Sequence, residues 1–499
     1  MLASCSFLEE KIQKLQLDSR QVAQNDLFIA LKGRDLDGRD FIEAAIKAGA
    51  IAIVADTEFS NDKTLTCHMV DGNKILQINI YQLANKISAF ANLFYDNPSE
   101  KMDVIGVTGT NGKTTVTQLI AQWAMLIGKK SAVLGTLGNG LCGHLVPSTN
   151  TTPSSVDIQS YLADFLAKDV TIVAMEVSSH GLALGRVSDV TFSASLFTNL
   201  SRDHLDFHNT MDDYNKAKWS LFSPSDDERA VKSSGKRIIN FDDEVGCSWI
   251  KQLDEVMVVS SSPKNLSNVM GLGKSYLAVS SVNYHDQGAT IIFESSFGNG
   301  VLHSRLFGDF NVSNLLLAFA ALLSLNYPLA ALVDTAALLL PVDGRMEIFS
   351  APEKPTVIID YAHTPDALDK ALCAAKSHCN GALWVIFGCG GDRDKGKRPL
   401  MAKVAQLHAR HIIVTNDNPR TENEDAIIND ILVGFAQIDD VKVIKDRASA
   451  ILWAINHASS EKDVILVAGK GHEDYQIIGN IKHDYSDRKT VSHFLGTSI

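Results

Sequence analysis

The chain has 499 residues, which at roughly 150 residues per domain suggests three domains. Its hydrophobic fraction of 45% and charged fraction of 21% are typical of a folded globular protein and argue against a disordered, collagen-like or membrane-bundle chain. The 46 Lys and Arg against 58 Asp and Glu give a net charge of −12, so we expect neither nucleic acid nor a membrane as a partner. A polyanion would have to be held by local cations, metal ions or helix N-termini.

The apolar runs and the cysteines point to a cytoplasmic enzyme. No run approaches the ~20 apolar residues needed to cross a bilayer, and residues 1–20 mix charges among apolar residues, unlike a secretory signal. The cysteines form no CxxC pair, which argues against a disulfide framework or a structural zinc site. They lie at positions 5, 67, 142, 247, 373, 379 and 389.

The first two segments each alternate strand-like and helix-like patterns. Residues 1–97 read as a small α/β domain, with apolar runs at 26–33 and 48–56 around a helical pattern at 41–50. Residues 98–340 read as a central ATPase-type parallel sheet. There a strand at 102–107, a glycine loop at 108–112 and a helix at 113–130 follow one another, with later strands at 171–177, 194–200, 275–284 and 289–296 and a helix at 311–325.

The third segment, residues 341–499, reads as a Rossmann-like α/β domain. Apolar runs recur at 356–360, 383–387, 411–415 and 463–467, each followed by a loop that contains glycine or proline. Because ligands gather at the carboxyl ends of parallel strands, the loops after these runs are candidate binding loops.

The strongest motif is the loop Gly109-Thr-Asn-Gly-Lys-Thr-Thr115 between a strand and a helix. Its glycines let backbone N–H groups turn towards phosphate oxygens, Lys113 can reach the β- and γ-phosphates, and the Thr114 hydroxyl suits Mg²⁺. The first glycine stands two residues later than in the usual spacing. The motif predicts ATP binding but not what the ATP drives.

Other polar residues are ambiguous when taken alone. Glu176 ends the strand-like run 171–177, where a carboxylate can hold Mg²⁺ or simply close a strand. His204 lies in the His/Asp-rich run 199–208. This run suits contact with a second metal ion or a phosphate better than a loop whose polar side chains only hydrogen-bond within the protein. Lys218 reads as an ordinary exposed helical lysine, and Lys395, Lys397 and Arg398 read as a solvated basic run.

Ten motifs occur in the order seen in the Mur ligases, and together they span nearly the whole chain. They are TGTNGKTT, STNTTPSS, MEVSSHGLALGRV, NLSRDHLDFH, GDFNVSN, DGRMEIF, DYAHTP, FGCGGDRDKGKRPLM, DNPRTEN and AGKGHE. The chain resembles this family, and most closely its members that add 2,6-diaminopimelate. The resemblance implies a domain for a UDP-linked substrate, a central ATPase and a domain that delivers an amino acid.

The resemblance also implies an activity. ATP would phosphorylate the D-glutamyl γ-carboxylate of UDP-N-acetylmuramoyl-L-alanyl-D-glutamate, and the amine of meso-2,6-diaminopimelate would attack the acyl-phosphate, in cytoplasmic peptidoglycan synthesis. Two Mg²⁺ ions and a monomer are expected. By resemblance, Lys218 is the lysine that becomes a carbamate (N6-carboxylysine) and joins Thr114, Glu176 and His204 as a metal ligand. Lys113, Glu176, His204 and Lys218 are then the catalytic set.

The resemblance carries over three sets of contacts. The nucleotide set is Gly109, Thr110, Asn111, Gly112, Lys113, Thr114, Thr115, Asn311, Arg345 and Asp360, with His363 as a further candidate. The UDP-muramoyl-dipeptide set is Leu17, Ser19, Asn150, Thr151, Thr152, Ser178 and Arg186, with Arg34, Asp35 and Leu36 as weaker candidates. Leu184 departs from the glutamine of close relatives. The diaminopimelate set is Arg393, Asp417, Asn418, Pro419, Arg420, Gly469 and Glu473.

Arg420 decides the expected amino acid. Diaminopimelate has a carboxylate that lysine lacks, and a guanidinium can bind it through two parallel hydrogen bonds. A lysine- or ornithine-adding ligase would not need this arginine. A folate polyglutamate ligase would lack the N-terminal domain and the DNPR motif, and a nucleotide-dependent switch would need neither that motif nor the Ser/Thr cluster at 148–155.

Overall fold

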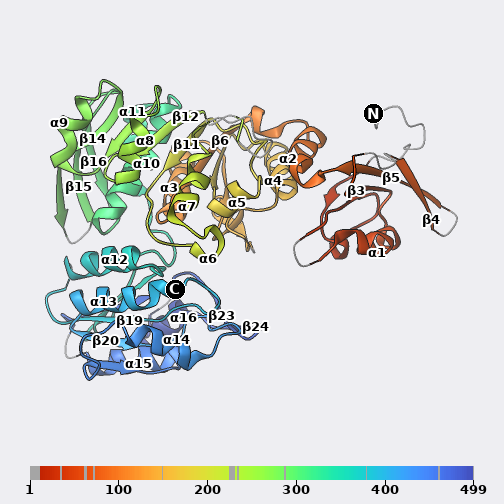
Figure 1. Ribbon diagram of the computed structural model, residues 1–499. Helices are drawn as coiled ribbons and strands as arrows, with labels where there is room; N and C mark the ends of the chain where they lie inside the picture. Colours follow the sequence, from red (N-terminus) through yellow and green to blue (C-terminus); the bar gives the residue numbers. More distant parts are fainter. Residues whose placement is uncertain are drawn as a thin grey trace.

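The computed structural model describes residues 12–33, 36–60, 65–70, 73–148, 150–223, 231–232, 235–285, 288–377, 379–458 and 461–497. These residues form three α/β domains. The N-terminal domain lies on one side of the middle domain, and the C-terminal domain lies beneath it (Figure 1). In the described residues no helix is long and apolar enough to cross a membrane.

The N-terminal domain is a five-stranded sheet in the order β1-β2-β3-β5-β4, parallel except for β4. Val156 of the middle domain packs into the same apolar cluster as Leu83, Ile87 and Ala91 of α2, which joins the two domains. The elements are β1 (Leu15–Gln16), η2 (Ser19–Gln21), β2 (Leu27–Ala30), η3 (Gly38–Phe41), α1 (Ile42–Ala48), β3 (Ala52–Thr57), β4 (Leu65–Val70), β5 (Asn73–Tyr81) and α2 (Leu83–Phe94).

The middle domain is an eleven-stranded sheet in the order β16-β15-β14-β13-β12-β11-β6-β10-β7-β8-β9. Its elements are η4 (Pro98–Lys101), β6 (Asp103–Thr108), α3 (Lys113–Leu126), β7 (Ser131–Gly135), β8 (Gly138–Leu141), β9 (His144–Val146), α4 (Ser155–Leu166), β10 (Ile172–Glu176), α5 (Ser179–Ala183), β11 (Ala194–Phe197), α6 (Leu205–His208), α7 (Met211–Trp219), β12 (Lys236–Asn240), α8 (Glu244–Ile250), β13 (Met257–Ser260), η5 (Pro263–Asn265), α9 (Leu266–Met270), β14 (Ser275–His285), β15 (Gly288–Ser295), β16 (Gly300–Ser304), α10 (Asp309–Ser324), α11 (Leu329–Thr335) and η6 (Ala336–Leu338).

The expected parallel sheet forms the centre of this domain, from β14 to β7. Both of its ends continue as antiparallel strands, β15 and β16 at one end and β8 and β9 at the other, so the sheet is mixed. Helices α3 and α10 pack on one face through an apolar core, and a second core lies on the other face. Strands buried on both faces explain why the central runs are almost wholly apolar in sequence.

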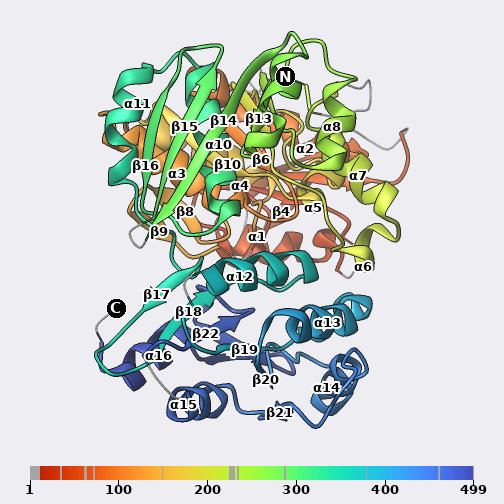
Figure 2. The ribbon, with the colours of Figure 1, turned by 90° about the vertical axis from the view of Figure 1, so that its left-hand side faces the viewer.

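The C-terminal sheet has the order β17-β18-β22-β19-β20-β21 and is parallel except for β17, so the four apolar runs predicted from sequence are its four neighbouring central strands. Helix α12 faces the middle domain (Figure 2). The elements are β17 (Glu347–Phe349), β18 (Thr356–Asp360), α12 (Pro365–Ser377), β19 (Leu383–Phe387), η7 (Lys395–Lys397), α13 (Arg398–His408), β20 (His411–Val414), α14 (Glu424–Leu432), β21 (Val441–Val443), α15 (Arg447–His457), β22 (Val464–Ala468), β23 (Tyr475–Ile478), β24 (Ile481–Asp484) and α16 (Asp487–Leu495).

Candidate active site

A cavity of about 650 Å³ lies between the middle and C-terminal domains. The middle domain supplies the loop after β6, Glu176 at the end of β10 and the residues that follow β11. The C-terminal domain supplies Arg345, the segment 360–363 after β18, and one side of α12. The carboxyl ends of strands from two sheets therefore meet in one cavity, as expected for ligand sites of α/β sheets.

Two glycines shape the loop between β6 and α3. Gly109 has φ +150° and Gly112 has φ +88°, conformations that side chains rarely adopt. A Cβ on Gly109 would lie 1.8 Å from the Thr198 hydroxyl oxygen, and a Cβ on Gly112 would lie 2.5 Å from Asn314 Oδ1. Helix α3 begins at Lys113, so its N-terminal N–H groups open onto the cavity and suit a phosphate.

Lys113 folds back over this loop. Its Nζ donates to the carbonyl oxygens of Gly109 and Thr110, both at 2.9 Å. Burial lowers the pKa of Lys113, although the negative charges of Glu176 and Asp203 oppose that shift. A phosphate oxygen entering the loop could replace the two carbonyls as partner of the amine.

Thr114 and Glu176 form an oxygen-rich pair beside the loop. The Thr114 hydroxyl donates to Glu176 Oε2 at 3.0 Å, and the backbone N–H of Thr136 donates to Glu176 Oε1 at 2.8 Å. Both side chains line the cavity, and Glu176 is buried. A buried carboxylate next to a hydroxyl is a donor set that fits a hard cation such as Mg²⁺.

Asp203 joins both domains at the cavity, and the sequence interpretation did not single it out. Its Oδ2 lies 3.4 Å from His204 Nε2 and 3.7 Å from His363 Nε2, and its Oδ1 lies 3.7 Å from Lys397 Nζ. Burial alone would raise the pKa of Asp203, but the hydrogen bond from His363 and the positive charge of Lys397 hold it well below its usual value. The charged partners identify Asp203 only after folding, because two of them come from the other domain.

His204 lines the cavity in a left-handed conformation at φ +55°. Burial lowers the pKa of His204 to about 3, and the neighbouring His180, Lys218 and Lys113 add to that effect against the charge of Asp203. The imidazole is therefore neutral at physiological pH, the form in which histidine can bind a metal ion.

Lys218 is buried, which corrects the first interpretation of it as an exposed helical lysine. It lies on α7, and its Nζ donates to the Gly109 carbonyl oxygen at 2.7 Å and sits 4.6 Å from the Tyr214 ring centre. Burial lowers the pKa of Lys218 well below its ordinary value, and the charge of Lys113 lowers it further. The fold thus places next to the phosphate loop an amine whose protonated form is disfavoured by burial.

The three remaining nucleotide candidates lie in different settings. Arg345 donates to the Thr114 hydroxyl at 3.1 Å, lies 4.3 Å from the Tyr361 ring centre and keeps a buried Nε without a partner among the described residues. Asp360 accepts from the N–H groups of Met346 and Ala362, and burial raises its pKa. Asn311 does not line the cavity; it accepts from Asn314, which does.

The candidates for the UDP-linked substrate divide between two domains. Thr152, Ser178 and Arg186 are joined by hydrogen bonds near Glu176. Thr152 Oγ1 donates to the Glu176 carbonyl oxygen and accepts from the Ser178 N–H. Arg186 donates to the Thr152 carbonyl oxygen at 2.7 Å. Thr151 lines the cavity, and Asn150 is exposed.

The other candidates for this substrate lie outside the cavity lining. Leu17 and Ser19 belong to the N-terminal domain. Leu184 is an exposed residue after α5, and Leu36 is exposed as well. Arg34 and Asp35 lie outside the described residues.

Arg393 and Arg420 lie near each other at the C-terminal loops, beside the same glycine backbone position. A Cβ on Gly390 would lie 2.9 Å from Arg420 Nη1 and 3.7 Å from Arg393 Cγ. Arg420 donates to the Gly391 carbonyl oxygen at 3.0 Å and Arg393 to that of Asp392, and in the described residues neither forms an ion pair. Burial lowers the pKa of Arg420, and the charge of Arg393 lowers it further. Such a pair suits a carboxylate ligand.

The backbone holds Arg420 in place. It has φ +53°, its N–H donates to the Ile477 carbonyl oxygen at 3.1 Å, and its carbonyl oxygen accepts from Gly479 N–H at 2.7 Å. The β23–β24 hairpin therefore fixes the loop that Pro419 begins.

A buried polar network lies next to this pair. Asn418 donates to Glu473 Oε2 at 2.9 Å and accepts from Lys470 Nζ at 3.0 Å, and Lys470 also lies 3.0 Å from Glu473. Burial would raise the pKa of Asp417, but the charges of Lys470 and Arg447 outweigh it and lower the pKa. Gly469 leaves room for Asp417, because a Cβ there would lie 2.6 Å from Asp417 Oδ2. Lys470 is a further residue that the sequence interpretation missed.

The interpretation of residues 395–398 as a solvated basic run was wrong for two of its three cations. Arg398 is fully buried and binds Glu422 at 2.7 Å and Asp430 at 2.9 Å. Lys397 is buried against Asp203. Only Lys395 is exposed. The acids that bind these cations are distant in sequence, so the local charge run could not indicate them.

The phosphate loop, the Thr114–Glu176 pair that fits Mg²⁺ and the second α/β sheet facing them define an ATP-dependent ligase of the Mur type. The comparisons with known proteins agree. The chain belongs to the Mur ligase family: the Mur ligase family catalytic domain matches residues 11–95, the Mur ligase middle domain 107–322, and the Mur ligase glutamate ligase domain 344–471.

Among its relatives is the UDP-N-acetylmuramoyl-L-alanyl-D-glutamate--2,6-diaminopimelate ligase of Haemophilus influenzae strain Rd, 51% identical over 97% of this chain and 96% of that protein. A solved structure of a ligase with the same name is 34% identical, covers 97% of this chain and 94% of its own and has a TM-score of 0.64. MurF from Acinetobacter baumannii, at 18% identity with coverage of 98% and 94%, shares the fold with a TM-score of 0.67.

Proposed function

We propose that the protein joins meso-2,6-diaminopimelate to the γ-carboxylate of D-glutamate in UDP-N-acetylmuramoyl-L-alanyl-D-glutamate, with cleavage of ATP, in the cytoplasmic synthesis of peptidoglycan precursors. The observation that carries this proposal is the proximity of Arg393 and Arg420, neither of which has a carboxylate partner among the described residues, in the domain that faces the phosphate loop. The relative at 51% identity bears the name of this activity.

The chemistry explains why two domains meet at the cavity. A carboxylate is a poor electrophile, so transfer of the γ-phosphoryl group of ATP to its oxygen first creates an acyl-phosphate, and the amine then displaces phosphate. The protein has to align the groups and stabilise negative charge. Lys113, Arg345 and the N-terminus of α3 would supply that stabilisation.

The donor set at the loop fits Mg²⁺. Thr114 and Glu176 would hold one ion, and His204 with a carbamylated Lys218 would hold a second. When bound, Mg²⁺ neutralises phosphate charge. Two features of the chain support the carbamate: burial lowers the pKa of Lys218, which favours the neutral amine that CO₂ requires, and its Nζ lies 2.7 Å from the Gly109 carbonyl oxygen of the phosphate loop.

The substrates would bind to residues of different domains, and of the residues proposed for them only Thr151 lines the cavity. Thr151, Thr152, Ser178 and Arg186 would hold the peptide end of the UDP-linked substrate, and Leu17, Ser19 and Asn150 its other parts. Arg393 and Arg420 would bind the distal carboxylate of diaminopimelate, and Asn418 and Glu473 would orient its ammonium. We propose domains at 1–97, 98–340 and 341–499, and a monomer, because one chain contains every element of the site.

A panel of amino acids tests the proposal. The purified protein, supplied with ATP, Mg²⁺ and the UDP-muramoyl dipeptide, should yield a ligated product by mass only with diaminopimelate and should release phosphate only when both substrates are present. Product with lysine or ornithine would identify a ligase of different specificity. Phosphate release without either substrate would identify a nucleotide-dependent switch.

Arg420→Ala tests the assignment of the amino-acid site. Removing one partner of a buried charged pair should reduce kcat/KM for diaminopimelate by ~2 kcal/mol or more, about 30-fold, with the KM for ATP unchanged. Arg410→Ala, an exposed arginine of the same domain, is the control. An unchanged preference for diaminopimelate in Arg420→Ala would refute the role.

A further inference from the structure

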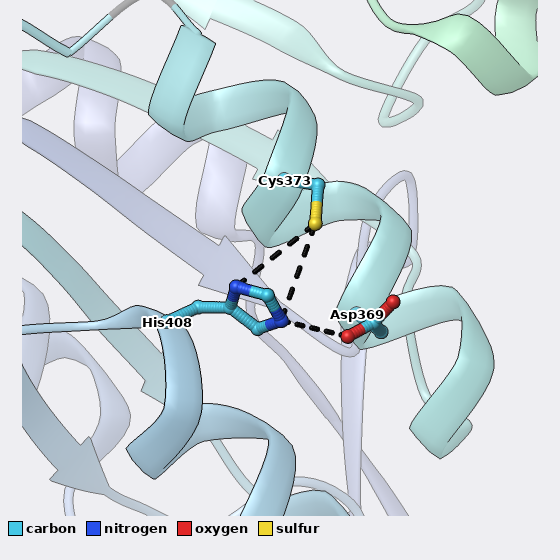
Figure 3. Close-up of side chains that lie close together, drawn as sticks. All are labelled: Asp369, Cys373 and His408. Atoms are coloured by element: carbon cyan, nitrogen blue, oxygen red, sulfur yellow. Dashed lines mark hydrogen bonds and ion pairs between the residues drawn. The ribbon is translucent and has the colours of Figure 1, made fainter.

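The side chains of Asp369, Cys373 and His408, to which the proposed ligase reaction assigns no role, point towards one another between α12 and α13 (Figure 3). Asp369 and Cys373 stand four residues apart on α12, so both project from one face of that helix. His408 is the last residue of α13, which packs against α12. Helix packing thus assembles three different metal-ligand types from two distant segments.

The ligand atoms are nearly at coordination distances. Cys373 Sγ lies 3.9 Å from His408 Nδ1 and 4.0 Å from Nε2, and His408 Nε2 lies 2.7 Å from Asp369 Oδ1. All three ligand atoms lie within 4.8 Å of one another. In a tetrahedral zinc site, the bond lengths imply ~3.6 Å between sulfur and nitrogen and ~3.4 Å between nitrogen and oxygen. Shifts of less than an ångström would therefore fit an ion between them.

The surroundings favour a cation. Cys373 and Asp369 line the interdomain cavity, as does Asp309 at the start of α10. Burial raises the pKa of Cys373, and the negative charges of Asp369 and Asp309 raise it further. The same negative charge that keeps the thiol protonated attracts a divalent cation, whose binding releases the thiol proton to solvent.

We propose that Asp369, Cys373 and His408 form a binding site for Zn²⁺ or a similar borderline transition metal ion, with water as the fourth ligand. A thiolate and an imidazole select such ions over Mg²⁺, which prefers oxygen ligands. Zn²⁺ bound here would tie α12 to α13 at the edge of the cavity. The absence of a CxxC pair argued against structural zinc because that argument counts neighbours in sequence, and Cys373 and His408 are 35 residues apart.

The site is tested on the full chain without nucleotide, so its outcome is independent of the ligase activity. Zn²⁺ is titrated against a chromophoric chelator in excess Mg²⁺, which occupies the hard-ligand sites. We expect one Zn²⁺ per chain whose Kd rises at least about tenfold in Cys373→Ser and in His408→Gln, because even the loss of an outer-shell partner costs 10- to 100-fold. Cys379→Ser is the matched control, because the Cys379 thiol donates to the Lys462 carbonyl oxygen and not to Asp369 or His408.

Co²⁺ provides a second measurement. The protein loaded with Co²⁺ should show a near-ultraviolet thiolate-to-metal charge-transfer band that is lost in Cys373→Ser and kept in Cys379→Ser. Thermal unfolding without metal should be the same for all variants, which shows that they fold. An unchanged Kd in both ligand variants, or a Co²⁺ spectrum without the thiolate band, would overturn the proposal.

Discussion

Lys113 and Lys218 donate to the same carbonyl oxygen, that of Gly109 in the phosphate loop. Two ammonium groups this close repel each other, and burial penalises both charges. The two shifts differ because Lys113 has Glu176 and Asp203 as compensating charges, whereas Lys218 has only Asp203. The fold therefore lowers the pKa of Lys218 further than that of Lys113, which is compensated by two carboxylates.

Lys218→Ala should abolish ligation, because the chain would lose the group that we propose becomes the second metal ligand. The protein should still fold, and a small added carboxylate should restore part of the activity by replacing the carbamate oxygens. Activity is measured as phosphate release with both substrates present. Lys216→Ala, an exposed lysine of the same helix that pairs with Asp212, should keep full activity. Full activity of Lys218→Ala without rescue would exclude the carbamate.

His472 makes the stability sensitive to acid. Burial lowers the pKa of His472 to about 3, helped by the charges of Arg345, Arg488 and Lys470, while the unfolded chain has the ordinary value near 6.5. The unfolded state thus binds one more proton between these two values. The protonation of His472 in the unfolded chain should therefore lower the free energy of unfolding by ~1.4 kcal/mol for each pH unit from 6.5 towards 3.

Urea unfolding of His472→Gln measures this contribution. Below pH 6.5, the slope of the unfolding free energy against pH should be smaller in the variant than in the parent protein by the contribution of one proton, ~1.4 kcal/mol per pH unit. His457→Gln, at the exposed end of α15, should leave the slope as it is in the parent protein. Equal slopes in the parent and in His472→Gln would show that His472 does not titrate as described.

At the scale of elements, the phosphate loop depends on backbone shape as much as on side chains. Thr198 Oγ1 donates to the Asn111 carbonyl oxygen at 2.6 Å, and Asn199 Oδ1 accepts from Asn111 N–H at 3.0 Å, so the end of β11 holds the loop open. The loop can approach β11 this closely only because Gly109 has no side chain.

Gly109→Ala should therefore lose nucleotide binding. The new methyl group would overlap the Thr198 hydroxyl, and the backbone conformation would add ~1–3 kcal/mol of strain. Calorimetric titration with ADP should show at least about a tenfold rise in Kd, equal to ~1.4 kcal/mol. Gly271→Ala, at the end of α9 with φ −67°, is the control and should bind ADP normally. Normal binding in Gly109→Ala would show that the loop can rearrange.

The elements themselves were largely predictable from the sequence. Buried parallel strands leave continuous apolar runs, so β18, β19, β20 and β22 were all found, as was the loop before α3. The antiparallel edges β8 and β9 were not predicted, because their residues include glycines and exposed positions without an apolar run. Burial of Lys397 and Arg398 was also missed, because tertiary contacts with Asp203 and Glu422 determine it.

At the scale of the whole molecule, charged pairs span the middle and C-terminal domains around the cavity. Asp203 meets Lys397 and His363, Arg202 meets Asp394 at 3.1 Å, and Asn111 donates to Asp366 at 3.0 Å. The Asp203–Lys397 pair is buried on both sides, whereas Arg202 is exposed. Since a buried charge without its partner is costly and an exposed pair is worth little, the first pair should dominate the docking of the two domains.

Lys397→Met keeps the apolar stem of the side chain and removes its charge, which leaves Asp203 buried without that cation. We expect kcat/KM for ligation to fall by ~2 kcal/mol or more, about 30-fold, because the two halves of the site no longer dock stably. Small-angle scattering should show a larger radius of gyration. Arg202→Ala should cost no more than ~1 kcal/mol and keep the parent radius. If Lys397→Met stays as compact and as active as Arg202→Ala, the buried pair does not hold the domains together, and the docking must rest on the apolar contacts of α12 with α10.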